Sequence, residues 1–113
     1  MVSPTQLRAL ALSFPDATEQ DHFGVPSFRV RGKIFATVPD DDHVRIMLHE
    51  EGTRAAVAEW PDCCAEHYWG KRLACVVVAL DRAPRELVTE LLTDAWVGKA
   101  PKTLARDYLA SLR

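Results

Sequence analysis

The chain has 113 residues, of which 48% are hydrophobic, and its 14 basic and 16 acidic side chains give a net charge of −2. This length suits one domain with one ordinary core, so we expect a single domain over residues 1–113. The nearly balanced charge excludes a global field that would attract nucleic acid or anionic lipid. Binding to either would therefore need a local patch.

Three cysteines, Cys63, Cys64 and Cys75, do not indicate a disulfide framework, because neighbouring cysteines seldom pair and one thiol is left over. This cysteine pattern favours a reducing compartment. The first residues lack the basic start and long apolar run of a signal peptide. The longest apolar run, residues 73–80, is far shorter than the roughly 20 residues that span a bilayer. We therefore expect a cytoplasmic protein with no membrane partner.

A first helix is predicted by the spacing of Ser3 and Gln6, which matches a capping box, and by Pro4 at the first helical position. Apolar residues then recur at helical spacing until Pro15 ends the pattern: Leu7, Leu10, Ala11 and Phe14.

Residues 18–49 alternate between apolar and polar side chains, which predicts an antiparallel meander. In its second strand, Phe28 and Val30 should share one face, and the other face should carry Ser27, Arg29 and Arg31. Gly32-Lys33 matches a two-residue type II′ turn with glycine first. One face of the third strand should then hold Ile34, Ala36 and Val38, and one face of a fourth should hold Val44, Ile46 and Leu48.

The second half of the sequence predicts a helix over residues 51–60, an irregular connection over 62–72 and a central, doubly covered strand over 73–80. Pro84 then opens a strongly apolar-striped helix that ends at Gly98, and a short terminal helix follows over residues 102–112. The predicted fold class is α+β, with an antiparallel sheet packed against helices.

Motifs for metal, nucleotide or covalent chemistry are missing from this sequence. Cys64 and His67 form the one close pair with ligand-like spacing, whereas a structural zinc site needs four ligands. No two glycines are close enough for a nucleotide fingerprint, and no sequence feature brings a cysteine to a histidine and an orienting carboxylate. We expect no metal, no cofactor and no enzymatic activity.

A basic cluster is the remaining candidate. Arg29 and Arg31 are predicted to project from one strand face, with Lys33 at the tip of the hairpin. Arg45 extends this row, and Lys71 and Arg72 form a second spot beside Trp69. Arginine binds phosphate in a bidentate manner and a nearby aromatic ring can stack on a base.

The expected energy of this cluster is modest. About three phosphate contacts would give a salt slope of log K near −2.7, so binding would be weak at physiological salt. Asp40, Asp41 and Asp42 would cancel part of the patch. The alternative interpretation is a solvated outer face whose charges prevent edge pairing.

Several blocks of residues together resemble the MmcQ/YjbR family. They are His22-Phe23-Gly24, Pro26-Ser27-Phe28-Arg29, Gly32-Lys33-Ile34-Phe35-Ala36, Trp69-Gly70, Asp94-Ala95-Trp96 and Ala100-Pro101-Lys102. The resemblance extends over nearly the whole chain, including the spacing between blocks. It implies a frataxin-like double-wing fold and a DNA-binding label, with Arg29 and Lys33 at the basic places of the motif.

Three functions follow as hypotheses. The first is a non-enzymatic module that binds DNA weakly through Arg29, Arg31 and Lys33. The second is a small-ligand-binding or accessory protein with a pocket lined by His22, Ser27, Lys33 and Trp69, which a concave cavity would favour. The third is a protein-interaction domain marked by an exposed apolar patch. We expect a monomer in each case.

Overall fold

The computed structural model describes residues 1–112, over which the chain forms four helices and six strands. In chain order they are α1 (Pro4–Leu12), β1 (Ala17–His22), β2 (Val25–Val30), β3 (Lys33–Asp40), β4 (His43–Ile46), α2 (Glu50–Glu59), β5 (Cys64–Trp69), β6 (Arg72–Ala79), α3 (Arg85–Lys99) and α4 (Lys102–Ser111). The strands form one antiparallel sheet in the order β1-β2-β3-β4-β6-β5. The predicted α+β class is confirmed.

The capping box of α1 is confirmed. The backbone N–H of Gln6 donates to the Ser3 hydroxyl at 3.1 Å, and the Ser3 N–H donates to the Gln6 side-chain oxygen at 2.9 Å. These two bonds satisfy donors that a helix start otherwise leaves free. None of the helices described over residues 1–112 combines the length and apolar character needed to cross a membrane.

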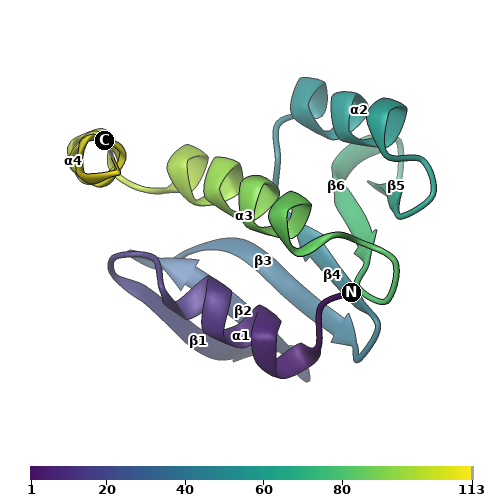
Figure 1. The fold of residues 1–113 in the computed structure, drawn as a ribbon, viewed down its shortest axis with the longest axis horizontal. Helices are drawn as coiled ribbons and strands as arrows, with labels where there is room; N and C mark the ends of the chain where they lie inside the picture. Colours follow the sequence, from purple (N-terminus) through teal and green to yellow (C-terminus); the bar gives the residue numbers. More distant parts are fainter. Residues whose placement is uncertain (113) are drawn as a thin grey trace.

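One face of the sheet is covered by α1, α2 and α3, with α3 crossing β3 and β4 (Figure 1). The residues paired in line beneath them are Phe28, Ala36, Ile46 and Val76, one from each of four neighbouring strands. All four are buried. We call this face the helix face and the opposite one the open face.

Trp96 joins α3 to the two ends of the chain. It is fully buried, its ring stacks on Phe14 at 5.7 Å between centroids, and Tyr108 of α4 meets it edge-on at 5.0 Å. Its indole N–H donates to the Pro15 carbonyl at 3.2 Å, so the polar atom of this large side chain has a partner. These contacts anchor α4, which extends beyond the end of α3 (Figure 1).

The β2–β3 turn differs from its predicted form. Val30 pairs with Lys33, so the turn residues are Arg31 and Gly32, with φ of 51° and 84°. Two positive φ values define a type I′ turn rather than type II′. Register explains the shift, because moving the pairing by one residue would turn Phe28 and Val30 away from the core. Lys33 is therefore the first residue of β3 and not the hairpin tip.

A bulge changes which residues of β3 share a face. Phe28 pairs with Ala36, but Arg29 pairs with Ile34, which leaves Phe35 as an extra residue. Phe35 is fully buried and meets Phe14 edge-on at 6.0 Å. The predicted shared face of Ile34 and Ala36 is therefore wrong, because the bulge places them on opposite faces.

The segment predicted as an irregular connection contains β5. This strand is an edge strand paired only with β6, and most of its residues are exposed. The exposed side chains explain why it lacks the apolar alternation of a half-buried strand. In β6 the valine-rich run lies inside the sheet as expected, between β4 and β5, with Cys75, Val76 and Val78 buried. The expected cover on both faces is wrong, because the helices pack on one face of the sheet.

The strained turn yields a stability prediction. Arg31→Asn should raise the free energy of unfolding by about 0.5–1 kcal/mol, because asparagine tolerates the left-handed conformation better than arginine. The Arg31–Asp16 ion pair that is lost is exposed, so it offsets little of this gain. Urea denaturation followed by circular dichroism measures the change. Lys33→Asn is the control, and an equal gain in that variant would contradict the explanation.

Candidate binding site on the open face of the sheet

The open face has a row of paired residues that crosses all six strands and is polar from β1 to β4. Its residues, paired in line from β1 to β5, are Gln20, Ser27, Thr37, Arg45, Val77 and Ala65. Beside this row, register also places Arg29, His67, Trp69 and Arg72 on the same face. Within the described strands, Asp40 at the end of β3 is the one carboxylate residue on this face. It is bonded to His43 at 2.9 Å. The open face is thus predominantly basic.

A cavity of about 480 Å³ lies on this face. We call it the sheet-face cavity, and its lining residues are His22, Phe23, Val25, Ile34, Thr37, Arg45, Met47, Leu48, Trp69, Arg72, Ala74 and Lys99. Its lining residues include three full cations and two aromatic rings but no carboxylate, in a protein whose net charge is −2. This composition favours an anionic ligand with an apolar part.

Thr37 is the most deeply buried polar residue that lines the cavity. Its side chain is 4% exposed, and its hydroxyl has no hydrogen-bond partner within residues 1–112. A buried polar atom without a partner is costly, and most such atoms in proteins are satisfied. Thr37 is therefore a cavity-lining residue whose hydroxyl makes no hydrogen bond within the described residues.

The neighbouring polar groups are already bonded to one another. The buried Ser27 hydroxyl donates to the Gln20 carbonyl at 2.8 Å, and it accepts a bond from Arg29 Nε at 3.2 Å. The Arg29 guanidinium also lies 3.5 Å from His22 Nδ1. These contacts hold Arg29 on the open face of β2 and link it to His22 at the cavity.

Two turns supply aromatic rings at the rim. Phe23, in the β1–β2 turn, is 95% exposed and meets His22 edge-on at 4.7 Å. Trp69, where β5 ends, is 54% exposed, and the Arg72 guanidinium lies 5.2 Å from its ring centroid. This cation–π contact keeps an aromatic surface and a positive charge together at one point.

The predicted hairpin cluster is divided by the structure. Arg29 lies on the open face, whereas Arg31 lies in the turn and binds Asp16 at 2.6 Å. Lys33 pairs with Val30, whose side chain is buried on the helix face, so it points away from Arg29. The prediction that Arg29 and Arg31 project from one strand face with Lys33 at the hairpin tip is therefore wrong, because Arg31 is a turn residue and Lys33 begins β3.

Other predicted residues do come together. Arg45, Arg72, His22 and Trp69 line the cavity, and Lys71 is exposed in the adjoining β5–β6 turn. Ser27 lies on the same face, paired with Thr37, while Lys33 is outside the cavity. Sequence reasoning missed Thr37 and Lys99. Neither carries a motif, and Lys99 reaches the sheet only because α3 ends beside it.

The cysteines are poor candidates for nucleophiles. Burial and the neighbouring Cys63 raise the pKa of the Cys64 thiol to about 12, and burial raises the pKa of Cys75. Cys64 and His67 are an odd number of residues apart in β5, so they point to opposite faces. No cluster of three or more metal-binding side chains occurs within residues 1–112.

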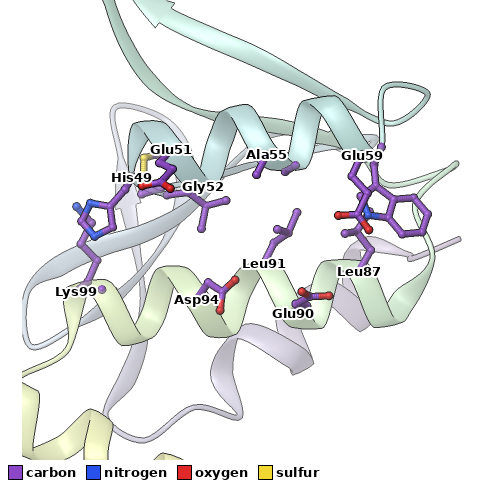
Figure 2. A pocket seen from close by; sticks show the side chains of 15 residues that line it. His49, Glu51, Gly52, Ala55, Glu59, Leu87, Glu90, Leu91, Asp94 and Lys99 are labelled. Carbon is purple, nitrogen blue, oxygen red and sulfur yellow. The ribbon is translucent and has the colours of Figure 1, made fainter.

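A second hollow, of about 460 Å³, lies between α2 and α3. Figure 2 shows Glu90 and Asp94 on α3 facing α2, with His49 and Lys99 at one end. Its carboxylate residues are Glu51, Glu59, Glu90 and Asp94. Burial raises the pKa of Asp94. The two hollows therefore differ in charge, because four carboxylate residues line the one between α2 and α3 and none lines the sheet-face cavity.

Comparison with known proteins gives the family. The YjbR family model matches residues 12–97. The chain belongs to the YjbR family. The crystal structure of the Deinococcus radiodurans protein DR2400, a DUF419 domain, has the same fold, with a TM-score of 0.73 and 22% sequence identity. The match covers 86% of this chain and 78% of that chain. A search of curated proteins found no match.

Two of the YjbR-like blocks lie next to the sheet-face cavity. His22-Phe23-Gly24 forms the β1–β2 turn and Trp69-Gly70 leads into the β5–β6 turn, and the side chains of His22, Phe23 and Trp69 line the sheet-face cavity. Gly24 and Gly70 both have positive φ, which these tight turns require. Two of the blocks by which this chain resembles YjbR proteins therefore lie at the cavity rim.

The raised pKa of Asp94 yields a pH prediction. The folded state binds the Asp94 proton more tightly than the unfolded state, so ionisation of this group at neutral pH lowers stability. Asp94→Asn should raise the melting temperature at pH 7 by only about 1 °C or less, because Asp94 is still exposed to solvent, which screens its charge. The gain should vanish below the unfolded-state pKa of about 3.9. Thermal denaturation at pH 7 and pH 3.5 checks this, and equal gains at both values would contradict it.

Proposed function

We propose that this YjbR protein is a non-enzymatic binding domain whose open sheet face contacts single-stranded nucleic acid. The observation that carries the proposal is the segregation of charge described above. Arg29, Arg45 and Arg72 share the open face, while the glutamates of the strands lie on the helix face. A locally basic face supports polyanion binding even where the net charge is slightly negative.

The aromatic rings support a single strand over a duplex. Trp69 and Phe23 are exposed at the rim of the cavity, where unpaired bases can reach their faces. Base stacking on aromatic side chains contributes about 1–3 kcal/mol per base and requires bases that are not already paired. The exposed Lys71 beside Trp69 adds a phosphate contact.

A small-ligand role is the second candidate, and the unpartnered Thr37 hydroxyl favours it. His22 and Trp69, which were predicted to line this pocket, do line the cavity. Its cations are Arg45, Arg72 and Lys99, and Lys33 is not among them. The buried, high-pKa cysteines support binding rather than covalent catalysis.

Fluorescence anisotropy with a labelled 12-nucleotide DNA strand tests the proposal. We expect binding at low salt, with a slope of log K against log salt near −2 to −3 for about three or four phosphate contacts. The duplex of the same sequence should bind more weakly. Failure to bind any strand at low salt would refute the proposal.

Two matched double variants locate the surface. Arg45→Gln with Arg72→Gln should weaken strand binding by about tenfold or more and lower the salt slope by about 1.4. Arg31→Gln with Lys33→Gln removes the same charge from the β2–β3 turn and the start of β3, and it should change affinity much less. If the hairpin pair has the larger effect, the contact surface is the hairpin and not the open face.

A further inference from the structure

We infer that the sheet-face cavity is a site for one nucleotide unit, in which a planar base is joined to a phosphate. The inference rests on the proposed function where the unit belongs to a strand, but a free nucleotide has the same chemistry. It names the part of a nucleic acid that the cavity takes, and it gives a role to Thr37. A basic face alone would predict neither the binding of a single nucleotide unit nor a role for Thr37.

The size and enclosure of the cavity are suited to a small molecule. Its volume of about 480 Å³ lies within the range of roughly 300–1,000 Å³ found for small-molecule sites. Residues of the β1–β2 turn, the centre of the sheet, the β5–β6 hairpin and the end of α3 all contribute to its wall. A flat platform for a passing strand would not need a wall built from four parts of the fold.

The anionic end of the ligand is indicated by Arg45, Arg72 and Lys99. These cations come from β4, β6 and α3, and none has an ion-pair partner within the described residues. Other arginines of the chain, such as Arg8 and Arg54, do form ion pairs. Guanidinium groups bind phosphate in a bidentate manner, so two of them beside a lysine match a phosphomonoester.

The other end of the ligand is indicated by the apolar wall. Val25, Ile34 and Leu48 line the cavity together with the ring of Trp69. Inorganic phosphate would leave this wall exposed to water, and a nucleoside would leave the three cations without an anion. A nucleotide satisfies both parts, since its ring has apolar faces and polar edges.

Thr37 supplies the point at which a polar edge is recognised. The residue lines the cavity, and its buried hydroxyl has no partner within residues 1–112. Thr53 of α2 is the other buried threonine with an unpartnered hydroxyl, but it does not line the cavity. The two residues therefore form a matched pair, because Thr→Val has the same shape change at both positions.

Isothermal titration with AMP and CMP tests the inference, with adenosine and inorganic phosphate as partial ligands. We expect one nucleotide per chain and an affinity at least tenfold higher than for either partial ligand. Thr37→Val should lower nucleotide affinity by about tenfold, since a polar edge of the ligand would lose its partner. Thr53→Val should leave it unchanged, and circular dichroism confirms that both variants fold.

Two results would overturn the inference. One is nucleotide affinity no higher than that of phosphate, and the other is an equal effect of the two threonine variants. If the 12-nucleotide strand binds but AMP and CMP do not, the proposed function stands and the nucleotide site is refuted. If AMP binds and no strand does, the site stands and the proposed function fails.

A pair of short strands separates the two sources of the nucleotide. Pentathymidylate with a 5′-phosphate presents a terminal phosphomonoester, and the same strand without it presents only diesters. A preference of tenfold or more for the phosphorylated strand supports the site and identifies a strand end as the ligand. Tight binding of AMP with no such preference supports the site and identifies the free nucleotide.

Discussion

The rest of the structure depends on the register of one row of paired residues, Phe28, Ala36, Ile46 and Val76, on the helix face. At its two ends the row meets Glu19 and Glu66, each of which binds an arginine of the helix above it, Arg8 of α1 or Arg54 of α2. The apolar centre drives packing against the helices, and the two exposed ion pairs contribute less energy but favour the same pairing. A shift of one residue would bury arginine and expose phenylalanine.

That register also creates the candidate site. Because side chains alternate across a strand, burying the apolar row places Ser27, Thr37 and Arg45 together on the face without helices. The strand glutamates, Glu19 and Glu66, lie on the helix face. The open face is therefore basic, although the whole chain is slightly acidic. Core packing and ligand binding are thus two outcomes of one pairing choice, and a substitution that disturbs the first will alter the second.

The sequence predicted the parts of the fold in which local chemistry and tertiary packing agree. The capping box of α1, the meander and the buried valine strand carry strong local signals, and all three are present. β5 was missed because an exposed edge strand has little apolar alternation, and the turn and bulge depend on long-range register. At the site, His22, Trp69, Arg45 and Arg72 were identified by type, whereas Thr37 and Lys99 become relevant only through the folded geometry.

The bulge at Phe35 has a consequence for comparing chains of this fold. Before Phe35, the even-numbered residue Ile34 lies on the open face. After Phe35, the odd-numbered residue Thr37 lies there, so the bulge reverses the alternation of the two faces within β3. The cavity therefore depends on the number of residues between Arg29 and Thr37, and less on which residues they are. A deletion of one residue there would hardly change the composition, but it would turn the side chains that line the cavity toward the core and core side chains toward the cavity. An alignment that opens a gap at this place would pair wall residues with core residues and hide a shared site.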